Sequence, residues 1–143
     1  MRRCFMVFAV AVFACLGCSK QNSITLQFRI AEENPGPGLT KFVAEPSGTP
    51  LYLHEPFVSE ADVDSTAVVT LEGQTGIAVL LTPEGAQKLE QVTEQNVGKR
   101  CAIVLNGKLV SSPRILDPIR GGRAVITADF TEAQAQDIAR RLR

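Results

Sequence analysis

Apolar and polar residues alternate with a period of two in several short runs of this chain. In Ser23–Ala31, every second residue is a large apolar one and the residues between are polar. This alternation is typical of a strand with one buried face. In Ser65–Leu71 it places Ala67, Val69 and Leu71 on a single face. Further strands are predicted at Leu51–Leu53, Ile77–Leu81 and Arg123–Ala128.

The segment Gly98–Pro113 (GKRCAIVLNGKLVSSP) carries the clearest hairpin signal in the chain. Its apolar runs, Cys101–Leu105 and Leu109–Val110, flank the dipeptide Asn106-Gly107. This dipeptide favours a two-residue type I′ turn, which needs positive φ at both central residues and matches the twist of the strands. The turn also sets the register. The expected pairs are Leu105 with Lys108, Val104 with Leu109, and Ile103 with Val110.

Both faces of this predicted hairpin are apolar. Because neighbouring strand residues point to opposite sides, helices packed on one side of the sheet cover only one of the two faces. The hairpin is then either interior to the fold or has one face that needs a partner. We predict that the second face is a contact surface for a partner, formed by Ala102, Val104 and Leu109.

Two helices are predicted from their start signals and apolar spacing. The first covers Pro83–Val97, with Thr82 as N-cap, proline at the first helical position and a glycine after its end. The second covers Glu132–Arg143, where Thr131 and the glutamine three residues later form a capping box. Strands joined by hairpins, together with two helices, predict an α+β fold: an antiparallel-rich sheet with two main helices packed on one face.

The first residues predict an export signal that ends in a lipidation site. Arg2 and Arg3 precede the apolar run Phe5–Leu16, which is too short to span a bilayer comfortably. The run is followed by Gly17-Cys18. A small residue before such a cysteine resembles the signal of bacterial lipoproteins, in which the cysteine is acylated and becomes the mature N-terminus.

Lipidation at Cys18 divides the chain into a leader over 1–17, a tether over 18–23 and an α+β domain over 24–143. Two acyl chains give stable anchoring to a membrane, whereas one chain gives marginal binding. We therefore expect the domain to face the extracytoplasmic side of a bacterial membrane. Cys15 is a weaker candidate for the modified residue, and a plain secretory leader is the remaining alternative.

Composition argues against nucleic-acid binding and against catalysis. Fifteen basic residues balance fifteen acidic ones, Trp is absent and there is one Tyr, so neither a basic surface nor an aromatic stacking platform is indicated. His54 is the only histidine, and we interpret Cys101 as a small buried apolar residue. The acidic run Glu60–Asp64 lacks the glycine turn of a Ca²⁺ loop, so we interpret it as capping and solvated charge. No metal or cofactor is predicted.

Two blocks of the chain carry a family resemblance. They are Leu80–Ile115 (LLTPEGAQKLEQVTEQNVGKRCAIVLNGKLVSSPRI) and Pro118–Arg143 (PIRGGRAVITADFTEAQAQDIARRLR). Both resemble the head subdomain of the first large periplasmic domain of SecD/SecDF, the protein-export membrane component. That family shows a TPEGA-type helix start, an AIVLDGK-type hairpin and a GG turn before an ITG segment. Asn106 replaces a frequent Asp, and Ala128 stands where the family often has glycine.

The resemblance implies a head-like module that contacts polypeptide clients or components of the Sec translocon, with no cofactor and no catalytic residue. SecD-type proteins continue into transmembrane helices, whereas no further apolar run of spanning length follows here. We therefore expect a lipid-anchored binding module rather than an export motor. The alternative is a structural or scaffold lipoprotein of the cell envelope with no export role.

Overall fold

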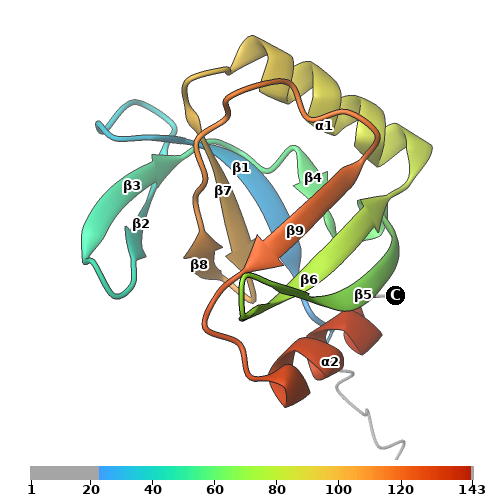
Figure 1. The fold of residues 1–143 in the computed structure, drawn as a ribbon. Coiled ribbons are helices and arrows are strands. Elements are labelled where there is room, and N and C mark those ends of the chain that lie inside the picture. The colour runs from blue at the N-terminus through green and yellow to red at the C-terminus, as the bar shows by residue number, and fades with distance from the viewer. Residues whose placement is uncertain (1–22, 143) are drawn as a thin grey trace, which may run out of the picture.

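The computed structural model of this protein describes residues 23–142, and the predicted leader and Cys18 lie outside them. The strands predicted from alternation are all found, with ends that differ by a few residues (Figure 1). In chain order the elements are β1 (Leu26–Glu32), β2 (Thr40–Ala44), β3 (Thr49–Leu53), β4 (Val58–Ser59), the 3-10 turn η1 (Glu60–Asp62), β5 (Val63–Leu71), β6 (Gln74–Leu81), α1 (Pro83–Gln95), β7 (Arg100–Leu105), β8 (Lys108–Ser111), β9 (Arg123–Thr127) and α2 (Glu132–Arg141).

The strands form two antiparallel sheets. The larger sheet has the order β2-β3-β1-β7-β8, with β4 paired to β1, and the smaller has the order β5-β6-β9. This arrangement confirms the α+β class, although the expected sheet is divided into two. The division arises because β6 pairs with β9, which lies more than forty residues further along the chain, rather than with the intervening hairpin β7-β8. Pairing over such a separation leaves no local sequence signal.

The main core fills the space between the two sheets. Phe28 of β1 is fully buried in this core, and Ile77 of β6 and Ile126 of β9 approach it from the smaller sheet. Helices α1 and α2 lie at opposite ends of this layer and both pack against β6 (Figure 1). Each helix adds its apolar stripe to the same core, through Leu89 of α1 and Ala139 of α2. The two helices thus cover the inner face of the smaller sheet.

The β7-β8 hairpin has the predicted turn and most of the predicted register. Asn106 and Gly107 have φ values of 50° and 76°, as a type I′ turn requires. Leu105 pairs with Lys108 and Val104 with Leu109, which confirms these two pairs. The third pair is wrong, because the register shifts after Val104 and Ile103 lies opposite Ser111. A β-bulge inserts one extra residue there, and bulges are not fixed by the turn.

Both helices begin at the predicted caps. The Thr82 hydroxyl accepts a hydrogen bond from the Gly85 amide, and Thr131 and Gln134 form the reciprocal bonds of a capping box. Helix α1 ends two residues earlier than predicted, because Asn96 is its C-cap and its side chain donates to a carbonyl of the last turn. The short turn after Ser59 is the 3-10 turn η1.

The β2-β3 hairpin was only half predicted. The sequence indicated its second strand at Leu51–Leu53, but Leu39–Pro50 showed too little alternation to predict β2. The structure explains this weakness, because β2 is an edge strand with exposed residues on either side of Phe42. An edge strand with a single inward side chain carries almost no periodic signal. Hydrogen bonding to β3 and the packing of Phe42 stabilise β2.

Candidate functional site

The contact surface predicted on the β7-β8 hairpin is covered by the protein's own chain. Ala102 and Val104 are only 0% and 3% exposed, and Leu109 is half-buried. They pack in a second, smaller core against Leu51 and Leu53 of β3. The β2-β3 hairpin therefore covers this face, and β2 comes close to β8, with Cα atoms within 8 Å. The prediction of an open contact surface at these residues is wrong for that reason.

The apolar surface that does face solvent is the outer side of the smaller sheet. Leu71 of β5, Leu80 of β6 and Val125 of β9 are 46%, 36% and 41% exposed. The registers place Ala78 between Ala67 and Val125 across this sheet. Because side chains alternate along each strand, the exposed residues lie on the side opposite the core. No helix of the described residues packs on this side, since both helices contribute to the core beneath.

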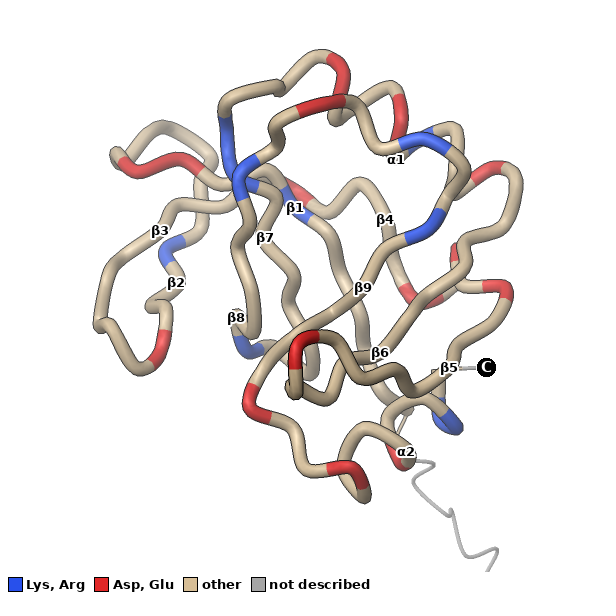
Figure 2. Tube along the Cα trace, in the orientation of Figure 1, with Lys and Arg blue, Asp and Glu red and all other residues tan. Residues whose placement is uncertain are grey.

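This outer face is a shallow apolar hollow with little charge. A depression of about 340 Å³ crosses all three strands and is lined mostly by apolar side chains, including Leu80 and Val125. Figure 2 shows β6 without any charged residue and β9 with one, Arg123, at its start. The residues that line the depression are Ser65, Thr66, Ala67, Ala78, Val79, Leu80, Arg123, Ala124 and Val125. We call this surface the outer face.

The sequence indicated the apolar sides of β5 and β6, but alternation alone did not show which of these sides faces solvent. Ala67, Val69 and Leu71 share a side of β5, as predicted, but this side faces solvent. The run Ile77–Leu81 is apolar at every position, so it has an apolar side directed inward and another directed outward. A continuous apolar run is typical of a strand covered on both sides. Here the second side has no cover within residues 23–142.

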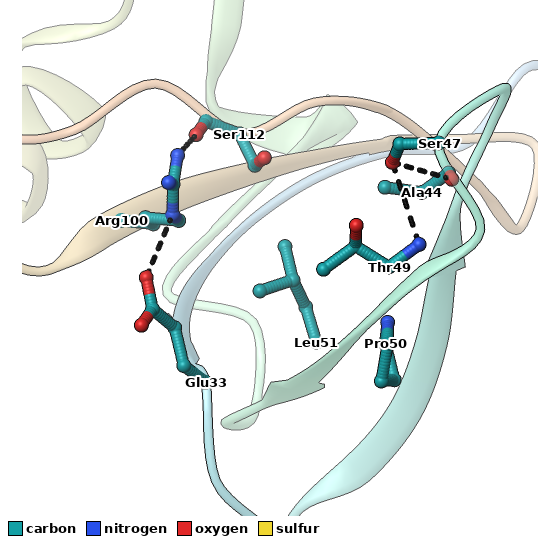
Figure 3. A pocket seen from close by; sticks show the side chains of 8 residues that line it. All are labelled: Glu33, Ala44, Ser47, Thr49, Pro50, Leu51, Arg100 and Ser112. Atoms are coloured by element: carbon teal, nitrogen blue, oxygen red, sulfur yellow. Dashed lines mark hydrogen bonds and ion pairs between the residues drawn. The ribbon is translucent and has the colours of Figure 1, made fainter.

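A second depression, of about 350 Å³, lies between β3 and the start of β7 and is lined by both polar and apolar groups (Figure 3). The Arg100 side chain crosses one wall, with Nε 3.4 Å from a Glu33 carboxylate oxygen and Nη1 donating to the Ser112 carbonyl at 3.1 Å. Thr49 and Leu51 of β3 form the other wall. Arg100 is thus held by Glu33, whose same carboxylate oxygen also lies 3.7 Å from Arg114 Nη2.

His54 contributes to an exposed ion-pair cluster and not to an acid-base site. Its Nε2 lies 3.1 Å from a Glu32 carboxylate oxygen, which also accepts a hydrogen bond from Lys99 Nζ at 2.8 Å. The bonds from Lys99 and His54 lower the pKa of Glu32. A carboxylate whose pKa is lowered in this way is a poor general acid or base at neutral pH. The cluster instead ties β1 to the start of β7.

Cys101 behaves as the buried apolar residue that its position in a strand predicted. Its side chain is 4% exposed, and burial raises the pKa of the thiol to about 12. A neutral thiol at this depth is neither a nucleophile nor a metal ligand. Among residues 23–142, no three His, Cys, Asp or Glu side chains come together as metal ligands. No helix in this part of the chain is long and apolar enough to cross a membrane.

Within the acidic run, Asp62 has the capping role that the sequence predicted. Its carboxylate accepts hydrogen bonds from the Ser59 amide at 3.0 Å and from Lys88 Nζ at 2.8 Å. Burial alone raises the pKa of Asp62, but the bonds from Lys88 and Ser59 outweigh burial and lower the pKa below its ordinary value of 3.8. The pair Asp62–Lys88 also joins η1 to helix α1.

Replacement of Asp62 by Asn should make the protein less stable at neutral pH and less sensitive to acid. Since the folded-state pKa of Asp62 is lowered, its charge stabilises the fold above about pH 4 and this contribution is lost as pH falls further. We expect Asp62→Asn to cost about 1 kcal/mol at pH 7 and much less at pH 2.5. Urea unfolding at both pH values measures the difference. Exposed Asp64→Asn is the control, and an equal cost at both pH values would contradict the assignment.

Comparison with known proteins places this fold in a family. The sequence profile described as "SecDF, P1 head subdomain" matches residues 39–143, which is most of the chain. The chain belongs to this family. The match includes both blocks on which the resemblance rested, and it begins upstream of them at Leu39. It thereby confirms the family inferred from the TPEGA helix start, the Asn106-Gly107 hairpin and the GG turn.

Relatives of this SecDF P1 head are subunits of the protein translocase. The chain is 44% identical over 92 residues to the protein translocase subunit SecDF of Thermus thermophilus, with 64% of this chain and 12% of the relative covered. It is 31% identical over 135 residues to the protein translocase subunit SecD of Syntrophobacter fumaroxidans, with 80% of this chain and 25% of the relative covered. The chain therefore spans a quarter or less of the length of these relatives.

Solved structures agree with this membership. A structure described as that of "a membrane component SecDF that enhances protein export" superposes with a TM-score of 0.69 at 30% identity, covering 85% of this chain and 62% of that one. A crystal structure of SecDF in a super-membrane-facing form gives a TM-score of 0.68 at 31% identity, covering 83% of this chain and 18% of that one. At this identity the likeness supports both the fold and the family.

In this P1 head, two of the family's motifs meet in one packing contact. Gly85 of the TPEGA motif lies against η1, where an added Cβ atom would come within 2.8 Å of the Asp62 Cβ. Gly122 of the GG turn lies against the next helix residue, with an added Cβ only 2.6 Å from the Ala86 Cβ. The Gly122 carbonyl also accepts a hydrogen bond from the Leu81 amide. These motifs therefore position α1 and are structural rather than catalytic.

Proposed function

We propose that this chain is a lipid-anchored extracytoplasmic module that contacts polypeptides during their export. The observation that carries this proposal is the outer face, an uncovered apolar sheet surface around Leu80 and Val125. Apolar patches of this kind on a small domain are typical of interaction sites. A nearly uncharged, shallow surface suits side chains of varied sequence, because it makes no specific polar demands on the ligand.

Family membership supports the link to export. The relatives are named as translocase subunits, and one solved relative is described as enhancing protein export. This chain corresponds to a small part of those proteins, so any shared role is restricted to what a P1 head alone can do. Binding is the role that remains, since residues 23–142 contain no assembled catalytic or metal-binding group.

Lipidation of Cys18 is the second part of the proposal. Four residues lie between Cys18 and Ser23, where the described structure begins. The five Cα–Cα steps from Cys18 to Ser23 reach at most about 17 Å, so an acyl anchor at Cys18 holds the domain close to the membrane surface. A binding surface kept there meets polypeptides as they leave the membrane. Components of the Sec translocon are the protein partners expected at that place.

Site-directed photocrosslinking in cells tests this function. A photoreactive residue at Val125 should capture a defined exported precursor during its export, whereas one at Val97, 50% exposed near the end of α1, should not. Val125→Asp should weaken the binding of the same precursor, because it places a charge in the apolar hollow. In parallel, Cys18→Ser should abolish the incorporation of a labelled fatty acid into the protein.

Three results would count against the proposal or one of its parts. Equal capture at Val125 and Val97 would show that the outer face has no special role. Stable association with envelope proteins but no capture of precursors would favour the alternative of a scaffold lipoprotein. Fatty-acid labelling that persists in Cys18→Ser would reject Cys18 as the lipid anchor while leaving the binding surface in place.

A further inference from the structure

Strand β5 is the exposed edge of the smaller sheet, and its hydrogen-bonding pattern can be derived from the turn that follows. Glu72 and Gly73 form a two-residue turn with φ values of 49° and 81°, and Leu71 pairs with Gln74. In such a hairpin the residues that flank the turn exchange both backbone hydrogen bonds, and bonded pairs then recur at every second residue. The N–H and C=O groups of Val68 and Thr70 therefore point away from β6.

No partner for these edge groups is present among residues 23–142. Strand β5 pairs with β6 alone, and no other backbone or side chain of the described residues bonds to the main chain of Val68 or Thr70. Thr66 is the preceding residue whose backbone groups point away from β6. Its side chain is buried, and its hydroxyl donates to the Ala139 carbonyl of α2. The open part of the edge thus runs from Val68 to the turn.

From Ser65 to Leu71 this edge lacks the charges and prolines that commonly prevent pairing with another chain, although a β-bulge precedes this stretch between Val63 and Ser65 and helix α2 packs against β5. Edge strands are usually blocked by lysine, proline or an inward-pointing charge, or are covered by another segment. The edge strands of the larger sheet follow this rule, since β2 and β8 contain Lys41 and Lys108 and approach each other. From Ser65 to Leu71, β5 contains no charge and no proline, and most of its residues are β-branched.

We propose that the edge of β5 binds an extended, uncharged and β-branched segment of a client polypeptide by strand addition, next to the outer face. The inference rests on the proposed function and specifies how the client is held. Backbone hydrogen bonds provide affinity without sequence specificity, and alternate side chains of the added strand extend the outer face. A client segment flanked by basic residues fits best, because Glu72 lies at the turn beside the open part of the edge and Asp64 lies near the other end of β5, before the buried Thr66.

The same charges disfavour pairing with a second copy of this chain in the register centred on Val68. An antiparallel copy of β5 centred on Val68 would place Asp64 opposite Glu72 at both ends of the paired segment. Like charges directly opposite each other destabilise strand pairs. A polypeptide with lysines at its ends would instead place opposite charges across both ends.

Hydrogen exchange on the full chain in lipid nanodiscs tests strand addition. The probe is the peptide acetyl-KTVTVTVK-amide, and the control is the same peptide with every backbone nitrogen methylated. The unmethylated peptide should slow exchange of the Val68 and Thr70 amide protons by about tenfold. The amides of Val69 and Leu71 already bond to β6 and should change little. The methylated peptide should bind at least about tenfold more weakly, the cost of losing two backbone hydrogen bonds.

A proline variant gives a second test on the protein side. Thr70→Pro removes only a donor that points away from β6, so the hairpin keeps its bonds and peptide binding should fall about tenfold. Thr70→Val keeps the N–H and should bind normally. The methylated-peptide comparison uses the unchanged chain, so the proposal remains testable if Thr70→Pro does not fold.

The possible outcomes separate this inference from the function on which it rests. Protection at Val68 and Thr70 that depends on peptide N–H groups supports strand addition. Equal binding of both peptides, without added protection, would reject strand addition and leave contact at the outer face intact. No binding of either peptide, together with failed crosslinking at Val125, would reject both. Protection that rises with protein concentration alone would identify a second copy as the occupant.

Discussion

Replacement of Gly122 by Ala should destabilise this protein by about 3 kcal/mol, with contributions from backbone strain and from overpacking. Gly122 has a φ of 64°, a conformation that L-residues with a Cβ atom adopt at a cost. Its added methyl group would also lie 2.6 Å from the Ala86 Cβ and 3.3 Å from its Cα. Because the neighbour is the body of α1 rather than a flexible side chain, relief requires a shift of the helix.

The adjacent glycine provides the control that separates these two contributions. Gly121 has a φ of 75°, but an added Cβ there would meet no atom within 4 Å. Gly121→Ala should therefore cost only the strain, about 1 kcal/mol. The double variant Gly122→Ala with Ala86→Gly removes the clash and should recover part of the loss, which urea unfolding of the four proteins measures. Equal costs for Gly121→Ala and Gly122→Ala would mean that the contact with α1 contributes nothing.

Replacement of Val104 by Asp should have an effect of at least similar size, about 3–5 kcal/mol, because it leaves an unpaired charge in a closed core. Val104 is 3% exposed beneath the β2-β3 hairpin, among Ala31, Leu53 and Ala102. None of these neighbours can pair with a carboxylate. We expect the protein to unfold at much lower urea concentration, or to fail to accumulate in cells.

Val125→Asp is the matched control for Val104→Asp. The substitution is the same and both residues lie in strands, but Val125 is 41% exposed on the outer face. Its cost should be about 1 kcal/mol or less, mainly from the low strand propensity of Asp. The two variants should also differ in function, since Val125→Asp should stay folded and lose polypeptide contact. If Val104→Asp were tolerated, the β2-β3 hairpin would not close over the β7-β8 hairpin as described.

Much of the fold could be predicted from local sequence, because its turns and helix caps depend on the chemistry of a few neighbouring residues. The turn at Asn106-Gly107 needs positive φ, which asparagine and glycine adopt readily, so the hairpin followed from a dipeptide. The caps at Thr82 and Thr131 followed from side-chain oxygens that accept free helix N–H groups. The same turn and cap residues also indicated the family, because they occur in order along one part of the chain.

The candidate site could not be predicted in the same way. Alternation showed that the β7-β8 hairpin has two apolar faces, and that an apolar run occurs at Ile77–Leu81. It did not determine which apolar face remained open. That depended on the β2-β3 hairpin, whose first strand had no periodic signal, and on the pairing of β6 with β9. A contact surface was therefore expected at Ala102 and Val104, where the protein has its second core.

The sequence by itself determined most of the elements, although not β2, together with the helix caps, the Asn106-Gly107 turn, the α+β class and the family, because each of these depends on neighbouring residues or on motifs in order. The tertiary structure alone decided which apolar surface is covered. Burial is a property of the whole chain: β2-β3 closes over one side of the β7-β8 hairpin, whereas nothing in residues 23–142 closes over the outer side of β5-β6-β9. The same long-range pairing leaves the backbone groups of Val68 and Thr70 free at an edge.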